Sequence, residues 1–73
     1  MRTVGKYSFL KGLNQIPRGQ VKQLRHDIMY ALEITAYTTW LDRLYGIVEP
    51  RVSEATAIEN VFEKYGITDI WGE

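Results

Sequence analysis

The chain has 73 residues with no cysteine and one histidine, and nine basic and nine acidic residues give it a formal net charge of zero. We therefore expect a single domain that spans residues 1–73, has no disulfide or metal site, and needs no cofactor. Its apolar runs are too short for a signal peptide or a membrane span, so the expected location is cytoplasmic.

The net charge conceals a strong sorting of charge along the chain. The first 25 positions hold six basic residues and no acid, whereas the remainder holds all nine acids and three basic residues. A charge of +6 is therefore followed by one of −6. A basic end on a compact domain can bind a polyanion such as nucleic acid, or it can dock on a second copy of the chain.

Residues 1–17 have apolar positions without one clean period, which predicts either an N-terminal arm or a short helix within residues 8–15. Ile16 precedes Pro17 and ends this element, because a residue before proline avoids the helical region. We expect a turn at Arg18 and Gly19. Residues 20–32 then predict a helix, whose apolar stripe recurs at steps of three and four and consists of Val21, Leu24, Ile28, Ala31 and Leu32.

The helical pattern breaks at Glu33 and Ile34 and resumes over residues 36–45, with Thr35 as the expected N-cap. Gly46 is placed to adopt the left-handed conformation that ends a helix. The expected buried stripe of this second helix consists of Tyr37, Trp40, Leu41 and Leu44.

A third helix is predicted over residues 53–65, with Ser53 as its N-cap and Gly66 as its left-handed end. Its apolar face comprises Ala57, Ile58, Val61, Phe62 and Tyr65. Ile67, Ile70 and Trp71 follow as an apolar tail that we expect to dock on the domain. The predicted fold class is all-α, with three main helices and a short N-terminal element.

The helices over residues 20–32 and 36–45 are joined by three residues, which makes them a helix-turn-helix candidate. In a DNA-binding version, the second helix presents one face to the major groove while Trp40 and Leu44 stay inside.

The stretch from Ile28 to Ile67 resembles the helix-turn-helix of the phage Cro and repressor family. The resemblance rests on a small residue, Ala31, in the first helix, on Thr35 before the second, and on a following helix that ends in Tyr65-Gly66-Ile67. The chain is also similar to short uncharacterised bacterial and prophage proteins that share its "IPRG", "VEPRVSEA" and "KYGI" segments. Glu33 stands where the Cro and repressor family usually has glycine, so we expect a differently built turn.

The resemblance implies a small transcriptional regulator that binds double-stranded DNA as a homodimer. Arg18, Lys22, Arg25 and Arg51 are then candidate phosphate contacts, or else ordinary solvated charges. Arg43 is a candidate guanine reader, or one half of a surface ion pair. The remaining candidates, which could contact base edges and phosphates or serve as a cap and a core residue, are Thr35, Tyr37, Thr38 and Thr39.

One other interpretation competes with DNA binding, while an RNA binder has no motif to support it. The same fold can serve as a protein-interaction module, which the zero net charge and the acidic third helix favour. An enzyme is not expected, because the sequence shows no nucleophile with a base, no metal cluster and no glycine-rich phosphate loop. His26 beside Asp27 is interpreted as a surface residue, and Trp40 and Trp71 as core residues rather than base-stacking ones.

Overall fold

The computed structural model describes residues 6–72 of the chain, and these residues confirm the all-α class. The predicted main helices are present with slightly different bounds, and the N-terminal element is a short helix rather than an arm. A 3₁₀ turn, η1, replaces the simple turn expected at Arg18 and Gly19. The elements are α1 (Leu10–Leu13), η1 (Arg18–Gln20), α2 (Val21–Ala31), α3 (Tyr37–Leu44) and α4 (Val52–Glu63).

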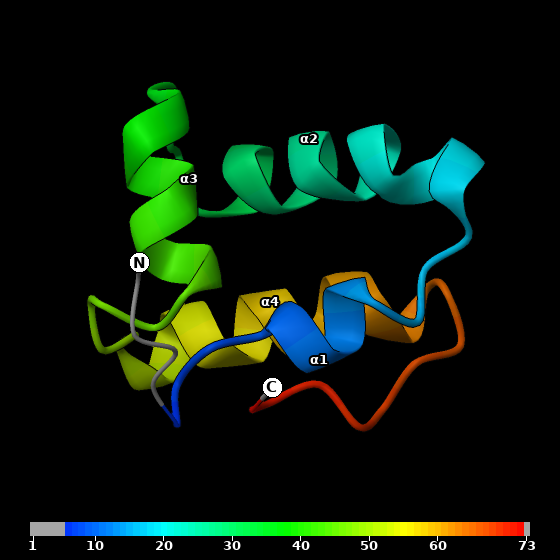
Figure 1. Ribbon diagram of the computed structural model, residues 1–73. Coiled ribbons are helices and arrows are strands. Elements are labelled where there is room, and N and C mark those ends of the chain that lie inside the picture. Colours follow the sequence, from blue (N-terminus) through cyan, green and yellow to red (C-terminus); the bar gives the residue numbers. More distant parts are fainter. Residues whose placement is uncertain (1–5, 73) are drawn as a thin grey trace.

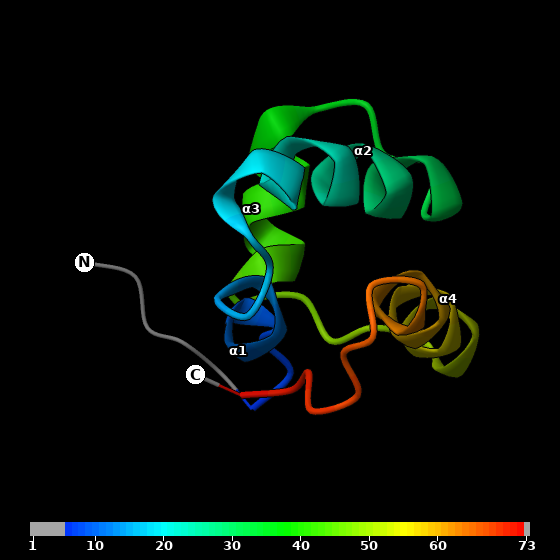
Figure 2. The same ribbon diagram turned by 90° about the vertical axis from the view of Figure 1, so that its right-hand side faces the viewer.

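The helices form two layers with α3 standing at one end (Figure 1). Helix α2 packs on α4, and α3 runs crosswise to both, from the level of α2 down to the level of α4. Figure 2 shows α1 beside α4, with the C-terminal tail passing close to α1. The two ends of the described chain therefore lie on the same side of the domain.

The core is built around the ring of Phe9, a residue for which the sequence pattern indicated no particular role. Its ring centroid lies 5.5 Å from that of Trp40, 6.0 Å from that of Phe62 and 6.3 Å from that of Trp71. Trp40 is 3% exposed, which confirms it as a core residue. Ile67 and Ile70 are buried in the same cluster, so the predicted docking of the C-terminal tail is also confirmed.

Backbone hydrogen bonds tie the N-terminal segment to both α3 and the C-terminal tail. The hydroxyl of the fully buried Ser8 donates to the carbonyl oxygen of Leu44 at 2.7 Å and accepts from the N–H of Leu10 at 3.0 Å. The N–H of Phe9 donates to the same Leu44 carbonyl at 3.2 Å. On the other side, the N–H of Gly72 donates to the Ser8 carbonyl at 2.7 Å. The segment around Ser8 is thus held from both sides.

All three main helices end in the same way, with a left-handed residue after the last turn. Gly46 (φ 74°) and Gly66 (φ 77°) take this conformation as predicted. Glu33 takes it too, with φ 56°, so the expectation of a differently built turn was wrong. The N–H of Ile34 donates to the Met29 carbonyl at 2.8 Å and that of Glu33 to the Tyr30 carbonyl at 3.2 Å, which is the bonding of a Schellman motif.

Both predicted N-caps were wrong. Helix α3 begins after Ala36, and no side chain of the described residues caps it. Helix α4 begins at Val52, one residue before Ser53, so that Arg51 occupies the N-cap position. There the Glu54 carboxylate accepts the backbone N–H of Arg51 at 2.9 Å, as the N3 acid of a capping box does.

Two positions assigned to buried stripes are exposed. Ala31 in α2 is exposed, and Tyr37 in α3 keeps 56% of its surface accessible. Both lie next to the turn between these helices, where the chain leaves the core. A three-to-four residue period identifies the apolar side of a helix but does not show where along the helix the neighbouring elements end.

We expect Gly46→Ala to destabilise the fold far more than Gly66→Ala. Both sites have a positive φ, which costs a side chain about 1–2 kcal/mol. A Cβ at Gly46 would also lie 2.5 Å from the Ser8 nitrogen, whereas nothing lies within 4 Å of a Cβ at Gly66. Urea unfolding should show a loss of about 3 kcal/mol or more for Gly46→Ala. Equal losses in the two variants would contradict this packing.

Glu33→Gly should stabilise the domain, because glycine adopts the left-handed conformation without strain. Relief of the strained backbone should add about 1 kcal/mol to the unfolding free energy. Part of this gain is offset because glycine gives the unfolded chain more conformational entropy. Glu33→Gln serves as the control, since it removes the charge and keeps the strain, and should stay within about 0.5 kcal/mol of the parent. Parallel chemical denaturation of the three proteins provides the comparison.

Candidate nucleic-acid interface

Three basic side chains line one flank of α2 and the 3₁₀ turn before it. Lys22 and Arg25 are three residues apart on α2, which places them on neighbouring positions of one helix side, and Arg18 lies in the 3₁₀ turn that leads into this helix. Arg18 and Lys22 are exposed and Arg25 is half-buried. Within residues 6–72, neither Arg18 nor Lys22 has an ion-pair partner. We call this row the basic stripe.

The basic stripe lies away from the surface that α2 buries against α4. Leu24 and Ile28 are fully buried and define the inward face of α2. Asp27, the only acid of this helix, lies on its other flank, where its carboxylate accepts from the Tyr65 hydroxyl at 2.8 Å and from the Gln23 amide at 2.8 Å. The carboxylate nearest in sequence to the stripe is therefore turned away and already bonded.

The first turn of α3 is exposed at the end of this stripe. Tyr37, Thr38 and Thr39 are all exposed, whereas Trp40 and Leu44 anchor the other side of the helix in the core. The Arg25 guanidinium lies 5.5 Å from the centroid of the Tyr37 ring, a cation–π contact that joins the stripe to α3. Since no side chain of the described residues caps α3, the first backbone N–H groups of this helix are left for an outside acceptor.

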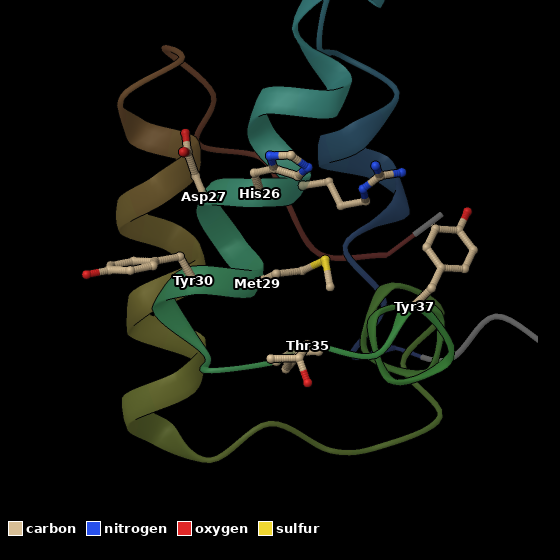
Figure 3. A pocket seen from close by; sticks show the side chains of 8 residues that line it. His26, Asp27, Met29, Tyr30, Thr35 and Tyr37 are labelled. Carbon is tan, nitrogen blue, oxygen red and sulfur yellow. The ribbon is translucent and has the colours of Figure 1, made fainter.

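A shallow groove follows the corner between α2 and α3. Figure 3 shows Met29 and Thr35 between the two helices, with Tyr37 on the α3 side and Asp27 and Tyr30 on the opposite flank. Tyr30 is 88% exposed, and its exposure was not predicted from the sequence. Its place one residue after Met29, outside the apolar stripe of α2, is the sequence signal that could have indicated it.

Two predicted contact residues lie elsewhere. The Arg43 guanidinium makes two hydrogen bonds of 2.9 and 3.0 Å to the Glu54 carboxylate, so α3 and α4 are joined by a half-buried ion pair. The backbone N–H of Arg51, and then Arg43, keep the pKa of Glu54 below its ordinary value despite desolvation. Arg51 itself is exposed at the start of α4, beyond the end of α3 opposite to the basic stripe.

Two acids lie near the candidate interface in the described part of the chain. Glu33 is exposed in the turn between α2 and α3, and Asp27 lines the groove with its carboxylate already bonded to Tyr65 and Gln23. The arrangement therefore combines three cations, two threonine hydroxyls and a tyrosine with two opposing charges.

The described residues show no cluster of metal-ligating side chains. Within residues 6–72, no three side chains of the His, Cys, Asp or Glu type come together at one place. His26 is exposed and lines the groove together with Asp27, whose carboxylate is bonded to Tyr65 and Gln23. In the same part of the chain, no helix has both the length and the apolar character that crossing a membrane requires.

Comparisons of the chain with protein-family models, with curated proteins and with solved structures found no match.

The hydrogen bond from Tyr65 to Asp27 should make stability depend on acid pH. The Tyr65 and Gln23 donors lower the pKa of Asp27 below its ordinary value of 3.8. A carboxylate with a lowered folded-state pKa stabilises the fold above its unfolded pKa, and this stabilisation is lost as the pH falls through the folded pKa. Tyr65→Phe should therefore raise the pKa of Asp27, as measured by NMR titration of the carboxyl carbon. An unchanged titration curve would show that this bond does not form in solution.

Proposed function

We propose that this protein binds double-stranded DNA through the basic stripe and the first turn of α3, as a small transcriptional regulator of repressor type. The observation that carries the proposal is the continuity of this surface. Three cations on η1 and α2 lead to an exposed helix start that no side chain of the described residues caps, and the contact between Arg25 and Tyr37 joins the two parts.

The proposed contacts divide into two kinds. Arg18 on η1 and Lys22 on α2 supply charge to the phosphate backbone, which gives affinity without reading sequence. Thr38 and Thr39 project from the first turn of α3, the part of a recognition helix that reaches base edges in the major groove. Threonine offers a hydroxyl to phosphates or bases and a methyl group to the methyl of thymine.

Arg43 is not included in the proposed surface, although it was the one strong guanine reader expected from the sequence. Its guanidinium fork is already used on Glu54, and breaking a half-buried pair would leave the carboxylate without its partner. With threonine and tyrosine as the remaining readers, sequence discrimination by one copy should be modest. A homodimer that reads two half-sites would multiply it.

A protein-interaction module without DNA binding is the second candidate function. The observation that favours it is Tyr30, a large aromatic side chain that is 88% exposed beside the groove. Binding of a protein through Tyr30 would respond weakly to salt, whereas binding of DNA through the basic stripe would weaken steeply.

Lys22→Glu should weaken binding to duplex DNA, and Lys64→Glu should not. Both substitutions change the net charge equally, and both residues are exposed, but Lys64 follows α4 and lies outside the stripe. Fluorescence anisotropy with a mixed-sequence duplex, measured from 50 to 200 mM salt, should give a salt dependence reduced by about one unit of slope for Lys22→Glu. Lys64→Glu should stay within about twofold of the parent.

Absence of duplex binding by the parent at low salt would refute the proposed function. Equal weakening by both substitutions would refute the assignment to the basic stripe, because the effect would then follow net charge alone. Circular dichroism of both variants establishes that each remains folded.

A further inference from the structure

A second surface, unrelated to the basic stripe, lies at the other end of α3. Ile47, Val48 and Val52 are exposed in and after the loop between α3 and α4, and we call them the loop patch. Val52 is 86% exposed although it is the first residue of α4. These three large apolar side chains are exposed within residues 47–52, and contiguous exposed apolar residues on a small domain mark interaction surfaces.

The loop patch borders a groove. Val52 forms one side of it, and the half-buried side chains of Tyr7, Pro50, Ala55 and Trp71 supply its apolar lining. A projecting valine therefore lies next to a hollow that accepts apolar groups. A protrusion beside a matching hollow on one face is what a twofold contact between identical chains needs, because each copy offers both halves.

The charges around the groove are also self-complementary. Lys6 lines the groove together with Glu49 and Glu59. A twofold contact can bring the cation of one copy towards the acids of the other, whereas a surface of a single sign would repel its own copy. A strongly basic partner would be repelled by Lys6, and a strongly acidic one by Glu49 and Glu59. The net charge of zero removes long-range repulsion between copies.

We propose that the loop patch and its groove form the interface of a homodimer, in which Val52 of each copy enters the groove of the other. This inference rests on the proposed function in one respect. Reading two DNA half-sites requires a dimer, and the loop patch would supply the interface of that dimer. The loop patch follows the C-terminal end of α3, and the basic stripe meets its N-terminal end. Pairing through the patch therefore leaves the proposed DNA surface of each copy uncovered.

Sedimentation equilibrium of the full chain, from about 1 μM to 1 mM and without DNA, tests the interface. The parent should approach twice the monomer mass of 8.5 kDa. Val52→Asp should lower the association constant about 100-fold, since each buried valine contributes about tenfold and the interface holds two. An acid at the first position of α4 suits the helix dipole, so the variant should fold normally.

Tyr30→Asp is the matched control, because Tyr30 is as exposed as Val52 but lies on α2. It should leave the association constant within about twofold. A parent that stays monomeric up to 1 mM would overturn the inference, as would a dimer that Val52→Asp leaves unchanged. Equal weakening by Tyr30→Asp would also overturn it, since the interface would then lie elsewhere.

Two further arms separate this inference from other outcomes. Flotation with vesicles of phosphatidylcholine and phosphatidylglycerol tests a membrane as occupant, and binding by a monomeric parent that Val52→Asp abolishes would overturn the dimer. A DNA titration of the parent, combined with its sedimentation result, separates the two proposals. A parent that dimerises but does not bind DNA refutes the proposed function alone, whereas a parent that stays monomeric but binds DNA refutes the dimer alone.

Discussion

The carbonyl oxygen of Leu44 is the point on which the arrangement of this domain depends. It accepts both the Ser8 hydroxyl and the Phe9 N–H, so the end of α3 is bonded to the N-terminal segment. Without these donors, a carbonyl at the end of a helix would be buried without a partner, at a cost of about 1–3 kcal/mol. The bonds also carry Phe9 into contact with Trp40, which unites a polar constraint with the aromatic core.

These bonds bring the N-terminal segment so close to the end of α3 that only glycine fits at position 46. Gly46 approaches the backbone of Tyr7 and Ser8 so closely that any Cβ would collide with it. The C-terminal tail completes the arrangement, because Gly72 bonds to Ser8 and Ile70 bonds to Gly12. A chain of this length buries only about 60% of its unfolded surface. Residues distant in sequence at both ends therefore have to supply what a larger core would otherwise provide.

The position of α3 links the core to the proposed function. Its C-terminal end is held by Ser8 and Phe9 and by the pair between Arg43 and Glu54. No side chain of the described residues caps its N-terminal turn, which faces solvent beside Arg25. One short helix thus has a fixed end that stabilises the domain and an exposed end that can meet a ligand. The charge sorting along the chain becomes spatial, since η1 and α2 carry the basic stripe and the exposed acids Glu59 and Glu63 lie on α4.

The periodicity of apolar residues was sufficient to predict the three main helices, and glycine chemistry was sufficient to predict two of their ends. Both are local properties, because a helix face and a left-handed residue depend on neighbours within a few positions. The row formed by Arg18, Lys22 and Arg25 could be predicted for the same reason.

Only the tertiary structure decided the features that join distant segments. It showed Phe9 at the centre of the core, Arg43 bonded to Glu54 instead of lying free, and Glu33 left-handed despite its side chain. It also showed that Thr35 and Ser53 are not the caps that their positions suggested. Each of these outcomes depends on which groups the fold brings together, and a carboxylate or carbonyl 11 or 36 positions away leaves no periodic trace in the sequence.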